Sequence, residues 1–135
     1  MDIEHQYPVE WQTAGNLNTC FVYADKNLLK RAISNLMQNS ISHNASGCKI
    51  YVNIITGKGY CTVIIADDGT GATEEQIEKI NNSPHYMACD ENKTEQQHGL
   101  GLLIVKQVAA AHNGTFTVSS SPYGGFSASL SLPVV

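Results

Sequence analysis

The sequence has few charged residues and no excess of basic ones. Charged residues make up 15% of the 135 residues, and eight Lys and Arg stand against twelve Asp and Glu, which leaves a formal net charge of −4. A protein that binds duplex nucleic acid needs clustered Lys and Arg to neutralise phosphates. The composition therefore argues against nucleic acid as a partner.

The sequence also lacks a hydrophobic run long enough to cross a membrane. The longest apolar stretch, residues 102–111, is interrupted by Lys106 and Gln107, whereas a spanning helix needs about 18 apolar residues. The first ten residues, MDIEHQYPVE, have neither the basic start nor the apolar stretch of a signal peptide. We therefore expect a cytoplasmic chain without direct membrane contact.

The cysteines do not form the pattern of a disulfide framework. Cys20, Cys48, Cys61 and Cys89 are widely spaced and make no CxxC pair. A chain of this length buries roughly two-thirds of its unfolded surface, so it forms a core without disulfides. Free thiols in a reducing cytoplasm are expected, and the length fits a single domain over residues 1–135.

Two segments have the hydrophobic spacing of long helices. Residues 25–43 place apolar side chains at 3.6-residue intervals on one face, with Asp25 in position to cap the N-terminus. Residues 100–112 form the second, closed by Asn113-Gly114 as a left-handed cap.

A short helix and a long loop are expected between these two helices. Thr73 and Gln76 form a capping box that opens a helix ending near Asn81. Residues 82–98 show no hydrophobic period, and a loop of that length inside one domain is usually functional or mobile.

Elsewhere apolar residues alternate with polar ones, as in strands with one buried face. Such segments are residues 5–13, 19–23, 49–55, 116–118 and 126–132, and residues 61–66 are nearly all apolar, as in a buried strand. Ala14-Gly15-Asn16 is expected to join the first two, and Gly57-Lys58-Gly59 to form a hairpin turn. Helices between strand pairs indicate an α+β two-layer sandwich, a mixed and mostly antiparallel sheet with helices on one face.

The first feature with possible chemistry is the polar side of the first long helix. Arg31, Asn35, Asn39 and His43 follow one another at four-residue spacing, which stacks them along one side. A solvated helix face explains this pattern equally well. However, Asn is a mediocre helix former, and a carboxamide oxygen is a competent ligand for Mg²⁺.

The second feature is Asp67-Asp68-Gly69-Thr70-Gly71, directly after an apolar strand. The strand delivers Asp67 to a site with little solvent, where its carboxylate needs hydrogen-bond donors or a charge. An amino group on a flat heterocycle would satisfy it, and the glycines allow the backbone to approach such a ring. The alternative is an ordinary Asp-Gly turn.

The third feature is His98-Gly99-Leu100-Gly101-Leu102 at the expected start of the second long helix. Free N–H groups and the helix dipole favour an anion there. A glycine-rich loop without a ligand is the alternative. Neither a Walker A loop nor a dinucleotide-binding GxGxxG is present.

Taken in order, these features resemble one family over residues 25–133: the ATP-binding catalytic domain of bacterial sensor histidine kinases, in the superfamily shared with gyrase-type ATPases, the mismatch-repair ATPase and the heat-shock chaperone. The segments that carry the resemblance are Asn35-Leu36-Met37-Gln38-Asn39-Ser40 (N box), Asp67-Asp68-Gly69-Thr70-Gly71 (G1 box), Gly99-Leu100-Gly101-Leu102 (G2 box), His112-Asn113-Gly114 and Gly124-Gly125.

The resemblance implies a role for each matching position. Asp67 would accept the exocyclic amine of adenine, with Gly69 and Gly71 close to the ring. Asn39 would coordinate the Mg²⁺ that bridges the triphosphate, and Asn35 would lie beside the phosphates.

Further positions would complete the ATP site. His43 would stack on or hydrogen-bond the nucleoside. His98 and the segment Gly99-Leu100-Gly101-Leu102 would cradle phosphate, and residues 82–98 would form the lid. Ser42 departs from the family, because many relatives carry a phosphate-binding Lys there.

The same resemblance implies transfer of phosphate to a protein rather than to water. Hydrolysing relatives have a glutamate where this chain has Asn35, and asparagine cannot take a proton from water. The acceptor would be a histidine on a separate dimerisation domain that then serves a response regulator. The chain would be a fragment of a larger, membrane-anchored kinase. An anti-sigma-factor serine kinase of the same superfamily and a non-catalytic nucleotide-binding module remain alternatives.

Overall fold

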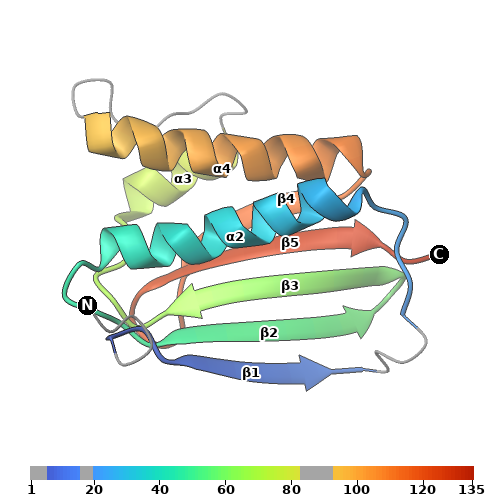
Figure 1. Ribbon diagram of the computed structural model, residues 1–135, viewed down its shortest axis with the longest axis horizontal. Coiled ribbons are helices and arrows are strands. Elements are labelled where there is room, and N and C mark those ends of the chain that lie inside the picture. Colours follow the sequence, from blue (N-terminus) through green and yellow to red (C-terminus); the bar gives the residue numbers. More distant parts are fainter. Residues whose placement is uncertain (1–5, 16–19, 83–92) are drawn as a thin grey trace.

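The computed structural model describes residues 6–15, 20–82 and 93–135, with the backbone alone for residues 93–100. They form a five-stranded sheet with helices packed on one of its faces (Figure 1). This confirms the α+β two-layer sandwich expected from the strand and helix patterns. Across these residues, no helix has both the length and the hydropathy that crossing a bilayer requires.

The sheet is mixed and mostly antiparallel, as predicted. Its strands are β1 (Val9–Ala14), β2 (Ile50–Gly57), β3 (Tyr60–Asp67), β4 (Thr115–Ser120) and β5 (Phe126–Pro133), in the order β1-β2-β3-β5-β4. Only the β1–β2 pair is parallel. The predicted hairpin turn joins β2 to β3: Gly57 pairs with Tyr60, and Lys58 and Gly59 between them have positive φ angles, as in a tight two-residue turn.

The N-terminal strands differ from the expectation. β1 begins at Val9 and pairs with β2, whereas Val22 makes only an isolated bridge to Val134. The prediction of a strand over residues 19–23 is therefore wrong for residues 20–23, and the predicted turn Ala14-Gly15-Asn16 lies partly outside the described residues. Parallel pairing of β1 with β2 instead requires a crossover connection, and the first long helix lies in that connection.

The helices are α2 (Lys26–His43), α3 (Glu74–Asn82) and α4 (Lys93–Ala111). Both predicted N-terminal caps are confirmed. The Asp25 carboxylate accepts hydrogen bonds from the first-turn backbone of α2. At α3, the Thr73 hydroxyl accepts from the Gln76 backbone N–H at 3.1 Å, and the Gln76 side chain accepts from the Thr73 N–H at 2.9 Å.

The second long helix is longer than predicted. It begins at Lys93 rather than at residue 100, so residues 93–98 of the predicted loop are helical. The segment KTEQQH has no apolar stripe, but Lys, Glu and Gln are good helix formers, which the hydrophobic period does not detect. The predicted cap at its end is confirmed, since Asn113 has a φ of 57° and the Gly114 N–H donates to the carbonyl of Ala109 at 2.8 Å.

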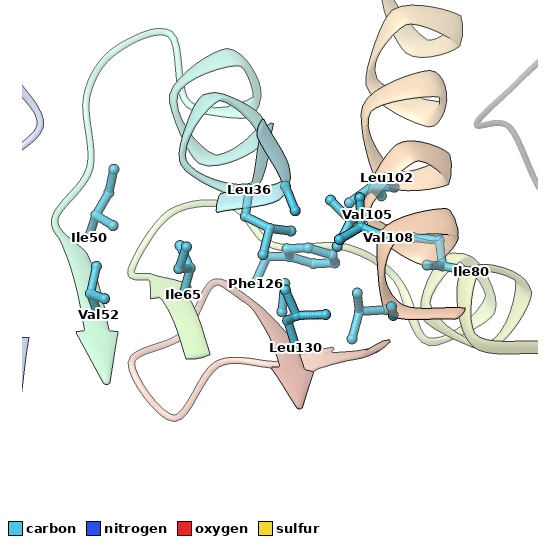
Figure 2. Packing of buried hydrophobic residues seen from close by; sticks show 14 of the residues in the cluster. Leu36, Ile50, Val52, Ile65, Ile80, Leu102, Val105, Val108, Phe126 and Leu130 are labelled. Carbon is cyan, nitrogen blue, oxygen red and sulfur yellow. The ribbon is translucent and has the colours of Figure 1, made fainter. Parts of the chain in front are cut away.

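The core lies between the helices and the sheet (Figure 2). α2 contributes Leu36, α4 contributes Leu102 and Val105, and the strands contribute side chains such as Ile65 and Leu130; all of these are buried. Because the buried stripe of α2 fixes its rotation, the polar side of the same helix has a defined direction.

The turn between β4 and β5 packs tightly against the end of β3. The Gly125 N–H donates to the carbonyl of Asp67 at 3.2 Å. A Cβ at position 125 would lie 2.1 Å from Oδ1 of Asp67 and 2.6 Å from the backbone N of Gly69. No side chain fits there unless the end of β3 moves.

We therefore expect Gly125→Ala to lower the free energy of unfolding by about 1–3 kcal/mol, because the added methyl overpacks this contact. Gly57→Ala is the control, since a Cβ there meets no atom within 4 Å. Denaturant unfolding of both variants checks the prediction. Equal stability of the two variants would show that the close approach at Gly125 has no energetic consequence.

Candidate functional site

The carboxylate of Asp67 is the most deeply buried charged group at the end of the sheet. Asp67 is the last residue of β3 and only 1% exposed. Its Oδ1 accepts hydrogen bonds from the backbone N–H of Gly69 at 3.0 Å and of Phe126 at 3.2 Å. Among the described residues no hydrogen bond reaches Oδ2. The carboxylate is thus oriented by the protein through one oxygen, and the other is available to a donor.

Asn39 has a buried oxygen without a partner. The residue is 8% exposed, and its Oδ1 makes no hydrogen bond within the described parts of the chain. Burying a carbonyl oxygen without a hydrogen bond costs free energy, and a bound ion at that oxygen would offset this cost. An amide oxygen is a hard ligand of the kind that Mg²⁺ takes alongside phosphate and water oxygens. The residue type and its environment therefore fit a magnesium ligand.

Two hydrogen bonds connect α2 to the other predicted motifs. Nδ2 of Asn35 donates to the carbonyl of Gly101 in α4 at 3.4 Å. At the other end, Oδ1 of Asn44 accepts from the backbone N–H of Thr70 at 3.0 Å. Since Asn39 lies between these two contacts on α2, the structure brings the three motifs predicted from the sequence into one site.

His43 is the last residue of α2 and is exposed. It lies next to Asn44, at the end of the helix that faces the loop after β3. Its predicted contact with a nucleoside stays a prediction.

The glycine-rich segment Gly99-Leu100-Gly101-Leu102 lies inside α4 rather than at its start. The prediction that it opens the helix is therefore wrong, since α4 begins at Lys93. Backbone N–H groups beyond the first turn of a helix bond within that helix. Leu102 is 6% exposed and belongs to the core. The side chain of His98 lies outside the described residues, as do residues 83–92 of the lid predicted over residues 82–98; residue 82 ends α3 and residues 93–98 are helical. Phosphate binding by this segment stays a prediction.

Asp68, next to Asp67 in the chain, bonds to the backbone of Lys49. Its Oδ1 accepts from the backbone N–H of Lys49 at 2.8 Å, and its own N–H donates to the carbonyl of Lys49 at 3.2 Å. Asp68 is exposed, whereas Asp67 is buried. The two adjacent carboxylates thus have different partners: Asp68 bonds to the backbone of Lys49, and Asp67 bonds to the backbone of Gly69 and Phe126.

A thiol lies close to these carboxylates. Burial of Cys48, and then the nearby charges of Asp67 and Asp68, raise the pKa of its thiol to about 11. The thiol is therefore neutral at physiological pH, and it adds no negative charge beside Asp67.

Sequence reasoning missed three residues that hold the site together. Asn44, 7% exposed, bonds the loop after β3. Tyr123, in the β4–β5 turn, stacks on Tyr51 of β2 with ring centroids 3.6 Å apart and an interplanar angle of 10°. This stack fixes the turn that carries Gly125. Asn44 had a local signal, as a polar residue directly after a helix, whereas the tyrosine pair depends on strand register and has none.

Comparison with known proteins identifies the family of this chain. Residues 24–135 match the sequence profile of the family described as "Histidine kinase-, DNA gyrase B-, and HSP90-like ATPase". Among curated relatives, the signal transduction histidine-protein kinase BaeS of Escherichia coli is 27% identical over 113 residues, and the adaptive-response sensory kinase SasA of Rippkaea orientalis is 35% identical over 116. Each alignment covers 84% of this chain but only 24% and 29% of the relatives.

Solved structures show the same fold. The mycobacterial sensor histidine kinase MprB superposes with a TM-score of 0.74 at 22% identity, covering 97% of this chain and 84% of that one. Full-length ShkA in complex with AMPPNP superposes with a TM-score of 0.76 at 20% identity, covering 98% of this chain and 26% of that one. Together with the profile match, this confirms the family indicated by the motifs: the chain belongs to the histidine kinase-, DNA gyrase B- and HSP90-like ATPases.

Proposed function

We propose that this chain is the ATP-binding catalytic domain of a sensor histidine kinase, which transfers the γ-phosphate of ATP to a histidine on a separate dimerisation domain. Two observations carry the proposal: the carboxylate of Asp67 is buried and oriented, and the buried amide oxygen of Asn39 has no hydrogen-bond partner in the described part of the chain. The curated relatives named above are sensory kinases, and ShkA was solved with AMPPNP.

Asp67 is suited to recognise the base. The N–H groups of Gly69 and Phe126 hold its Oδ1, so Oδ2 accepts the exocyclic amine of adenine. A charge-assisted hydrogen bond in a buried site is strong and selective, because a base with a carbonyl at that position would face a carboxylate. Gly71 lies on the same loop with a φ of 71°, and a Cβ there would lie 3.1 Å from the carbonyl oxygen of Gly125.

Asn39 is suited to hold Mg²⁺, with the remaining ligands supplied by phosphate and water. When bound, the ion neutralises charge on the triphosphate and helps to position it for transfer. Asn35, one helical turn earlier, lies beside the phosphates and is tied to α4 through Gly101. Asparagine cannot act as a general base toward water, which favours a protein acceptor over hydrolysis.

The partners follow from the class of relative. The chain spans about a quarter of the relatives it matches, and the histidine-bearing domain is proposed to belong to the same parent kinase. A response regulator would receive the phosphate from that domain. Anchoring of the parent in the cell membrane is part of the same proposal.

Phosphoryl transfer is tested by mixing the chain with Mg·ATP labelled at the γ-phosphate and a histidine-bearing dimerisation domain of a sensor kinase. We expect label on that domain that is lost in acid, as phosphohistidine is, and no transfer with Asn39→Ala. Stable label on a serine of an anti-sigma-factor antagonist would instead identify a serine kinase. Binding without any transfer would identify a nucleotide-binding module.

Asp67→Asn is expected to weaken ATP binding by about a hundredfold, because a hydrogen bond to a charged group contributes about 1.5–3 kcal/mol. The two N–H groups at Oδ1 require an acceptor, so the new amide turns its NH₂ toward the base and presents a donor to a donor. Calorimetric titration measures the change. Asp68→Asn, beside it but bonded to Lys49, is the control, and equal affinities of the two variants would contradict the assignment.

Asn39→Ala is expected to abolish most of the Mg²⁺ dependence of ATP binding, since it removes the proposed ligand oxygen. Titrations with ATP, with and without Mg²⁺, should give a ratio of dissociation constants that falls by about tenfold relative to the wild type. Gln38→Ala is the control, because Gln38 is exposed and bonded to Ser42 on α2. An unchanged ratio in Asn39→Ala would place the metal ligand elsewhere.

A further inference from the structure

We propose that Asn44 is a positioning residue, which fixes the loop Asp67–Gly71 relative to α2 and thereby sets where the base lies with respect to Asn39. This inference rests on the proposed nucleotide site. Its structural half, the ordering of the loop, concerns the free protein and can be tested without nucleotide.

The end of α2 holds Asn44 rigidly. Asn44 is the C-cap of α2, is 7% exposed, and donates its backbone N–H to the carbonyl of Ile41 at 3.3 Å. Its Nδ2 donates to the carbonyl of Ser40 at 2.8 Å. From the other side, the buried hydroxyl of Tyr7 donates to the Asn44 carbonyl at 2.7 Å.

The side chain of Asn44 reaches from this anchor to the loop after β3. Its Oδ1 accepts from the backbone N–H of Thr70 at 3.0 Å. A Cβ at position 69 would lie 1.9 Å from that same Oδ1, and Gly69 does not have a positive φ angle. Gly69 is thus required by the approach of Asn44, rather than by an unusual backbone conformation.

The bond between Asn44 and Thr70 helps to fix the position of the Asp67 carboxylate, which is proposed to bind the base. Gly69 donates its N–H to Oδ1 of Asp67 at 3.0 Å, and Thr70 is its chain neighbour. The amide group of Asn44 uses its oxygen toward the loop and its NH₂ toward α2. A residue with only an acceptor or only a donor cannot make both connections.

Asn44→Ala removes both connections and is compared with Tyr7→Phe, which loosens the same corner through the Asn44 carbonyl but leaves the side-chain bond to Thr70. We expect Asn44→Ala to speed hydrogen exchange of the Thr70 amide in the free protein by about fivefold, since a single hydrogen bond is worth about 1 kcal/mol. We also expect weaker binding of Mg·ADP and a smaller preference for Mg·ADP over Mg·GDP. Tyr7→Phe should preserve both the exchange rate and the preference.

Several results would decide the question. If Asn44→Ala and Tyr7→Phe change exchange and base preference in proportion to their loss of stability, Asn44 is only structural and the inference is overturned. If the wild type does not bind Mg·ADP, the proposed function fails, while exchange at Thr70 still tests the ordering of the loop. Asn44→Ser, a milder change with a hydroxyl too short for both bonds, carries the same comparison if the alanine variant does not fold.

Discussion

The site depends on the cost of burying a carboxylate at the end of a strand. Asp67 is 1% exposed, and an ionised group in that position must be satisfied by directed donors. Two backbone N–H groups, from the loop after β3 and from the start of β5, supply them at one oxygen. The tight β4–β5 turn at Gly125 is a consequence of bringing backbone to that oxygen, whereas the close approach at Gly69 is to the side chain of Asn44.

α2 connects the chemistry to the core. Its apolar stripe, with Leu36 only 1% exposed, packs against the sheet, and this fixes the rotation of the whole helix. Asn35 bonds to Gly101 of α4, Asn39 has a buried oxygen without a partner among the described residues, and Asn44 bonds to the loop after β3. The same helix therefore contributes to the core and makes the contacts with α4 and with the loop after β3.

What could be predicted from the sequence was local. The cap at Asp25 and the box of Thr73 with Gln76 depend on residues two or three apart, and both are present. The partner of β1 was not predictable, because alternation identifies a strand but not its neighbour. The early start of α4 was missed because residues 93–98 are uniformly polar. Asn44 acts through Thr70, 26 positions away, and only the fold brings them together.

The three sequence motifs pointed to nucleotide binding because their order and residue types match a family, although each alone had an ordinary explanation. The geometry adds what the motifs lacked: which oxygen of Asp67 is occupied, and that the oxygen of Asn39 has no partner among the described residues. Directional chemistry of this kind depends on distances between distant segments, and no spacing along the chain contains it.

Glycines within a helix weaken it. Gly99 and Gly101 lie in α4, and each costs about 1 kcal/mol of helix stability relative to alanine. The turns that precede them begin at Lys93, and their sequence KTEQQH carries no apolar stripe. The two glycines therefore make this part of α4 less stable than the same helix with alanine at both positions would be.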